Sequence, residues 1–183
     1  MDNIILKARL YARSAHSHIS METVSGDIRP HIEHLQEVAD LVWASGGSDI
    51  EIAAAFLHDS VEDTSTTIED IEKHFGKEIA RIVDELTDKP DLAELRNLER
   101  KTKQAERMVT KSQNAKRIKI ADQTSNIRMI VTDPKKTWSV ENNRNYVIGA
   151  KMIADHCKGI SPTLDELFDS ECRKAAMHFH IES

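Results

Sequence analysis

Apolar residues recur at helical spacing along most of the chain, and this pattern predicts a protein built from helices. The clearest example is Ile32–Trp43, where positions 32, 35, 38, 39 and 42 are apolar and share one face. Pro30 stands at the start of this segment and Gly46 just beyond its end, where each residue favours a helix boundary. We therefore expect a helix between these two residues.

The same periodicity, interrupted by turn signals, predicts further helices. Their expected ranges are about 4–15, 51–59, 67–75, 77–86, 91–110, 114–131, 140–157 and 161–180. A polar loop is expected from His18 to Arg29. The chain is thus predicted to be all-α, a bundle of about eight or nine helices in a single domain that spans residues 1–183.

Two helix starts carry capping signals. Ser48 or Asp49 is expected to cap the helix at 51–59. Thr66 and Glu69 are expected to form a capping box before the helix that ends at Gly76.

Composition agrees with a helical protein, because Gly and Pro number only 6 and 4 among 183 residues. Aromatic residues make up 4%, so the core must consist mainly of aliphatic side chains. The formal net charge of -6 argues against a nucleic-acid partner, since a phosphate backbone requires a cationic surface.

The expected location is the cytoplasm, with no membrane partner. The N-terminus does not resemble a signal peptide, and no segment approaches the roughly 20 apolar residues of a membrane span. Cys157 and Cys172 show no CxxC spacing and are expected to be free thiols in a reducing compartment. The sequence carries no indication of an oligomeric state.

The segment LHDSVEDT, residues 57–64, is the most informative for function. A His-Asp pair in an apolar helix is costly unless both groups find partners, and a bound cation would satisfy both. Glu62 and Asp63 follow His58 and Asp59 at a spacing of four. Residues four apart share a helix face, so we expect the four polar groups to project into one cavity.

Two more residues complete a candidate metal site. His34 lies in the helix that follows Pro30, and Asp122 lies in the segment KIADQTSN. With His58 and Asp59 they form a mixed nitrogen and oxygen set that suits Mn²⁺, Fe²⁺ or Zn²⁺. Such a metal lowers the pKa of a bound water and polarises a phosphoryl oxygen, while Glu62 or Asp63 can orient that water and move its proton.

The pattern H…HD…D resembles the HD-domain phosphohydrolase superfamily. More specifically, LHDSVEDTSTTIEDIEKHFG and AKRIKIADQTSNIR resemble the hydrolase domain of the RelA/SpoT family and its stand-alone small alarmone hydrolase relatives, over roughly residues 1–157. The resemblance implies an HD-type helical bundle that removes the 3′-pyrophosphate from ppGpp or a related alarmone, with Mn²⁺ as cofactor and a small nucleotide as its partner.

The resemblance also implies roles for individual residues. The metal ligands would be His34, His58, Asp59 and Asp122, and the catalytic acidic pair Glu62 and Asp63. The candidates for substrate binding are Asn126, Tyr146, Lys119 and Arg144. Arg128 belongs to the second motif, and His16 matches an Ala-His pair that is a candidate for the wall of the cleft.

This sequence departs from the family pattern around the expected substrate. The family usually has a basic stretch after the first helix, but no Arg-Lys pair stands near Ser20 and Met21. The other departures are His31 in place of Tyr, Leu35 in place of Pro, and Asn97 and Asn142 where relatives often carry a basic residue. From Arg96 to Arg128 the chain is rich in Arg and Lys, most of them expected on a solvated face, with Lys119 as the exception.

Three hypotheses for function follow. The first is an alarmone hydrolase acting on ppGpp or on a sibling such as ppApp. The second is an HD phosphohydrolase of another nucleotide, which the altered basic stretch favours. The third is a nucleotide-binding module without turnover, which the presence of both Glu62 and Asp63 disfavours.

Overall fold

The computed structural model describes residues 3–92, 95 and 97–181, and helices form nearly all of their regular structure, as predicted. The helices are α1 (Ile4–Ala15), α2 (His31–Ala44), α3 (Asp49–Leu57), α4 (Ser60–Asp63), α5 (Ile68–Phe75), α6 (Lys77–Leu86), α7 (Asn97–Met108), α8 (Gln113–Thr132), α9 (Val140–Asp155) and α10 (Pro162–Phe179). A short 3₁₀ helix, η1 (Pro90–Leu92), precedes α7, and β1 (Ser20–Glu22) pairs with β2 (Ile28–Pro30).

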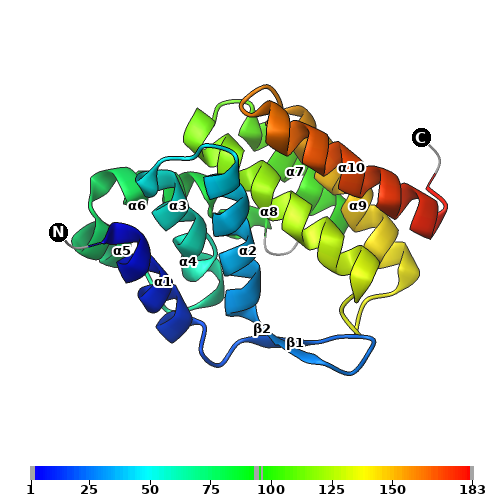
Figure 1. Cartoon of the computed structure of the whole chain (residues 1–183), viewed down its shortest axis with the longest axis horizontal. Helices are drawn as coiled ribbons and strands as arrows, with labels where there is room; N and C mark the ends of the chain where they lie inside the picture. Colours follow the sequence, from blue (N-terminus) through cyan, green and yellow to red (C-terminus); the bar gives the residue numbers. More distant parts are fainter. Residues whose placement is uncertain (1–2, 93–94, 96, 182–183) are drawn as a thin grey trace.

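Helix α8 lies at the centre of the bundle. It packs against α2, α3 and α6 on one side and against α9 and α10 on the other. Figure 1 shows α2 beside α8 in the middle, with α1, α3, α5 and α6 towards the N-terminal end and α7, α9 and α10 towards the C-terminal end. A residue on α8 can therefore meet side chains from both ends of the sequence.

The polar segment between α1 and α2 contains a small hairpin, so the prediction of a loop from His18 to Arg29 was wrong in part. Ser20 lies opposite Pro30 and Glu22 opposite Ile28, in antiparallel register. The strands have three residues each, too few to show an alternating apolar pattern. Contacts from a distant segment stabilise the hairpin, among them the hydrogen bond from the Ser25 amide to Asp133 (3.0 Å).

One predicted cap is confirmed and the other is displaced by one residue. Ser48 forms a capping box with Glu51 at the start of α3. At α5 the box is formed by Thr67 and Asp70, not by Thr66 and Glu69. Thr66 belongs to the preceding turn, because its amide donates to the Thr64 hydroxyl (3.0 Å).

The predicted helix at 51–59 ends earlier, at Leu57. Asp59 has φ -94° and ψ -2°, so the chain leaves regular helical geometry there before α4 begins. The amide of Asp63 still donates to the carbonyl oxygen of Asp59 (2.9 Å). The HD pair thus lies at a bend between two helices, and the motif does not share one continuous helix face.

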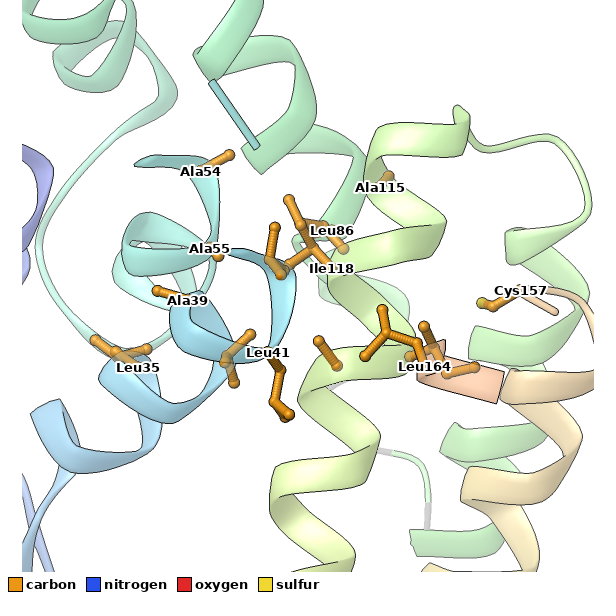
Figure 2. Packing of buried hydrophobic residues seen from close by; sticks show 14 of the residues in the cluster. Leu35, Ala39, Leu41, Ala54, Ala55, Leu86, Ala115, Ile118, Cys157 and Leu164 are labelled. Carbon is orange, nitrogen blue, oxygen red and sulfur yellow. The ribbon is translucent and has the colours of Figure 1, made fainter. Parts of the chain in front are cut away.

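One buried hydrophobic cluster draws on side chains from α1 to α10. Its residues are mostly small and aliphatic, and Figure 2 shows Ile118 of α8 beside Leu86 of α6, with Leu35, Ala39 and Leu41 of α2 nearby. Within the described residues, no helix is both long and apolar enough to cross a membrane.

We predict that Ile118→Ala lowers the free energy of unfolding by roughly 2–5 kcal/mol, because it leaves a cavity in the fully buried face of α8. Urea denaturation with an unchanged m-value would measure this loss. Val109→Ala is the control, since the Val109 residue is 56% exposed. Equal stability of the two variants would contradict the central place given to α8.

Candidate metal centre and substrate cavity

A cavity of about 570 Å³ opens between the two ends of the bundle. Its walls come from the β1–β2 hairpin, α2, the HD bend with α4, α7, α8 and α9. The predicted site residues that line it are His34, Asp59, Glu62, Asp63, Lys119, Asp122, Asn126 and Tyr146. Helices that are remote in sequence thus contribute to one cavity, because α2 and α9 pack against α8 and α7 packs against α9.

The four predicted metal ligands converge at the base of this cavity. Nε2 of His34 lies 3.4 Å from Oδ1 of Asp122 and 3.8 Å from Oδ2 of Asp59. Nε2 of His58 lies 3.2 Å from Oδ1 of Asp59 and 3.9 Å from Oδ1 of Asp122. Separations of this size between ligand atoms suit one cation at usual metal–ligand distances of about 2.0–2.2 Å.

Hydrogen bonds hold both imidazoles with Nε2 towards the carboxylates. Nδ1 of His58 donates to the carbonyl oxygen of Ala55 (2.8 Å). Nδ1 of His34 donates to the Ser125 hydroxyl (3.0 Å), which itself donates to Glu37 (2.7 Å). Fixing Nδ1 as the donor leaves Nε2 free to bind a metal, which is the usual arrangement around histidine ligands.

An unsatisfied atom supports a metal at this place. Nε2 of His58 is buried and has no hydrogen-bond partner in the described part of the chain. A buried polar atom without a partner costs free energy, and a cation bound by His58, His34, Asp59 and Asp122 would remove that cost. The residues therefore fit a divalent metal.

The electrostatics of the four groups point the same way. Burial opposes the charged forms of both carboxyls. The surrounding histidines hold the pKa of Asp59 well below its usual range, and Lys119 with His34 and His58 does the same for Asp122. Burial also opposes charge on His34, but Asp122 and Asp59 outweigh it and raise the pKa of that imidazole. Burial lowers the pKa of His58. Two ionised carboxylates thus favour positive charge between them, either a proton on His34 or a metal cation that replaces it.

The two members of the acidic pair face different neighbours. Glu62 accepts a hydrogen bond from the Asp88 amide (2.7 Å) and lies 3.3 Å from Arg100. Burial, together with the nearby Asp59 and Asp88, raises the pKa of Glu62 to about 7 although Lys119 opposes the shift. A carboxyl group with this pKa can exchange a proton near neutral pH.

Asp63 points away from Glu62. Its carboxylate lies 3.4 Å from Nε2 of His31. Burial and the charge of Asp59 raise its pKa. The acidic pair therefore reaches two sides of the metal centre.

Asp122 is surrounded by polar side chains of its own helix. It accepts hydrogen bonds from Gln123 (2.7 Å) and Asn126 (2.5 Å), and Nζ of Lys119 lies 3.1 Å from it. Lys119 and Asn126, both expected to bind substrate, thus lie in the cavity wall but also support Asp122.

Lys101 is a cavity residue that the sequence analysis missed, because it was placed on a solvated helix face. It is buried, its Nζ donates to Gln123 (2.8 Å), and it lies 3.9 Å from the centre of the Tyr146 ring. Burial and the charge of Lys119 lower its pKa to about 7. The available signal was its spacing from Leu98, Ala105 and Met108, which puts a lysine in the apolar stripe of α7.

The remaining predicted cations lie elsewhere. Arg144 donates from Nε to the carbonyl oxygen of Phe179 (2.6 Å) and is not among the residues that line the cavity. Arg128 forms ion pairs with Glu37 and Glu171, both at 3.0 Å. Arg96 lies outside the described residues, as does the side chain of Asn97.

Curated relatives cover most of the chain. It is 34% identical over 168 residues to guanosine-3′,5′-bis(diphosphate) 3′-pyrophosphohydrolase MESH1 of Xenopus tropicalis, covering 91% of each protein. The human protein of the same name is 36% identical over 139 residues, covering 75% of this chain and 76% of that one.

Solved structures with the same fold agree. One, described as a metazoan ortholog of SpoT that hydrolyzes ppGpp and plays a role in starvation responses, superposes with a TM-score of 0.85 at 28% identity, covering 95% of this chain and 96% of that one. A protein from Listeria monocytogenes EGD-e gives a TM-score of 0.63 at 27% identity, covering 80% and 99%. Residues 8–147 match the family described as HD domain. The chain therefore belongs to the HD-domain family, as its motifs predicted.

Proposed function

We propose that this protein is a metal-dependent hydrolase that removes the 3′-pyrophosphate from ppGpp or its adenosine counterpart, with Mn²⁺ as the metal. The observation that carries the proposal is the convergence of His34, His58, Asp59 and Asp122 at the base of a cavity that Glu62 also lines. The name of the Xenopus and human relatives supports the substrate class.

The proposed mechanism divides the work between two sides of the cavity. His34, His58, Asp59 and Asp122 would hold a divalent cation, which would lower the pKa of a bound water and polarise a phosphoryl oxygen. Glu62 accepts a proton from the attacking water, for which a pKa of about 7 is suitable. Asp63, on the other side, helps to orient that water.

Cationic side chains would bind the phosphates. Lys119, Lys101 and Arg100 line the cavity on α7 and α8. Phosphate groups are bound well by such cations when the surroundings exclude water. Tyr146, whose ring lies 5.4 Å from that of Trp138, would contact the base or sugar, and Asn126 would contact the nucleotide.

A second candidate substrate is a different nucleotide. Between residues 20 and 30, the part of the chain that forms the hairpin wall, Arg29 is the sole Lys or Arg, and it lies 3.7 Å from Glu33. Lys135, which bridges to Thr23, is the other basic residue of the described lining on this side, and so low a positive charge would favour a ligand with fewer phosphates there.

We also propose a cytoplasmic location. Cys157 and Cys172 are buried free thiols, which are typical of proteins in reducing compartments.

We expect Glu62→Gln to keep the fold and the metal while kcat falls roughly 10²- to 10⁴-fold, because glutamine cannot accept the proton. Pyrophosphate release from ppGpp with Mn²⁺ would measure kcat, and bound metal would be quantified in parallel. Glu69→Gln, an exposed change on α5, is the matched control. Full activity of Glu62→Gln would remove Glu62 from the mechanism.

His58→Ala should abolish metal binding at the four-residue site and turnover. It should also lower the free energy of unfolding by roughly 1–3 kcal/mol, because Asp59 would lose a partner. Calorimetric titration with Mn²⁺ and thermal unfolding would test both effects. His156→Ala, at an exposed histidine, should change neither. Unaltered Mn²⁺ affinity and turnover in His58→Ala would refute the ligand assignment.

Lys101→Met should stabilise the protein at pH 6 by roughly 1–4 kcal/mol while reducing turnover, because a buried charge is removed from the phosphate-binding wall. The pKa of Lys101 is about 7 in the folded protein against an ordinary 10.5, so the unfolded chain binds more protons between these values. Wild-type stability should therefore rise from pH 7 to about 10.5 relative to Lys101→Met.

Denaturant titrations at pH 6 and pH 9.5 would measure this difference. Lys103→Met, an exposed lysine on the same helix, should leave turnover and its pH-dependence unaltered. A destabilised Lys101→Met at pH 6, with normal turnover, would show that Lys101 has a structural role.

A further inference from the structure

A second group of potential metal ligands lies beside the first. His16, His31 and Asp63 each offer a ligand atom, and these atoms lie within 4.8 Å of one another. They come from the end of α1, the start of α2 and the end of α4. Three separate elements therefore bring two imidazoles and a carboxylate to one place.

His16 is the residue that points to a ligand. It is 2% exposed, and its Nδ1 donates to the carbonyl oxygen of Ala12 (2.9 Å). Its Nε2 is buried and accepts no hydrogen bond from any residue that the structure describes. A lone pair held in this way is costly unless a donor or a cation reaches it.

The same arrangement occurs at His58. There too Nδ1 donates to a carbonyl oxygen of the preceding turn, Ala55, and Nε2 is buried without a hydrogen-bond partner in the described residues. His58 thus presents Nε2 to the first group of ligands, and His16 presents Nε2 in the same way to the second group.

His31 and Asp59 connect the two groups. Nε2 of His31 lies 3.0 Å from Oδ2 of Asp59 and 3.4 Å from Oδ2 of Asp63, and its ring stacks on that of His16 with centroids 4.9 Å apart. Asp59 directs Oδ1 towards His58 (3.2 Å) and Oδ2 towards His31. Nε2 of His31 donates to Asp59, and a bound cation could take the place of this N–H group as the partner of both carboxylates.

We propose that His16, His31 and Asp63 bind a second divalent cation, with Asp59 as a carboxylate shared with the first site. Two imidazole nitrogens and carboxylate oxygens favour Mn²⁺, Fe²⁺, Co²⁺ or Zn²⁺ over Ca²⁺ or Mg²⁺. Cations that share a carboxylate commonly lie about 3.5–4 Å apart and act together on phosphate oxygens.

This inference rests on the proposed function only for its catalytic role. A second cation would add positive charge on the hairpin side of the cavity, where the basic residues of the described lining are Arg29 and Lys135. Asp63 would then act on the water through the cation that it binds.

The test is the number of metal ions bound by the full-length chain. Metal-free protein would be dialysed against Mn²⁺, and bound metal per chain would be measured by elemental analysis, with electron paramagnetic resonance to detect coupled Mn²⁺ pairs. We expect about two ions per chain and a coupled signal in the wild type. His16→Gln should bind about one ion and lose the coupling, whereas His18→Gln, at an exposed histidine, should resemble the wild type.

Each other outcome is informative. One ion per chain in the wild type, unchanged in His16→Gln, would refute the second site and leave the proposed function intact. No bound ion at all would refute both. Two ions in His16→Gln would refute the ligand assignment. If His16→Gln fails to fold, His31→Gln, at a half-buried position, provides the same test.

Discussion

The burial of the Asp122 carboxylate in the middle of α8 is the constraint on which the rest of the site depends. Asp122 is 5% exposed, in a helix that packs against both ends of the bundle. Such a carboxylate must be paired, and Lys119, Gln123, Asn126 and His34 all approach it. These neighbours also line the cavity. The requirement to pair one buried carboxylate therefore positions both the candidate metal ligands and the lysine of the cavity wall.

The bend at His58 and Asp59 provides the complementary half. Because α3 ends at Leu57, Asp59 can turn one oxygen towards His58 and the other towards His31. Glu62 and Asp63 are consecutive in α4, and adjacent residues of a helix do not share a face, so Glu62 meets Arg100 and Asp63 meets His31. The bend thus places Asp59 between His58 and His31, and the helix that follows places Glu62 and Asp63 in two different chemical environments.

Periodicity was sufficient for most helices, since an apolar stripe must face the core wherever the helix lies. His58 and Asp59 could be singled out as candidate ligands because a His-Asp pair in an apolar segment requires a partner, whereas His34 and Asp122 were added as further candidates supported by the motif resemblance. What the sequence could not show depended on tertiary packing. The spacing of Lys101 puts it in the apolar stripe of α7, but only the packing of α7 on α9 shows that it is buried beside Tyr146. Arg144 donates to the carbonyl oxygen of Phe179, a residue 35 positions away. The hairpin depends on contacts with the distant Asp133.

The most direct test of the account is the identity of the products formed from ppGpp by the purified Mn²⁺-loaded protein, beside ppApp and common nucleotides. The account predicts GDP and pyrophosphate in equal amounts from ppGpp, because the cleaved bond joins the 3′-oxygen to the pyrophosphate. Release of single phosphates, or turnover of other nucleotides alone, would contradict the proposed substrate. Absence of any product from protein that binds the metal would contradict the proposed catalysis.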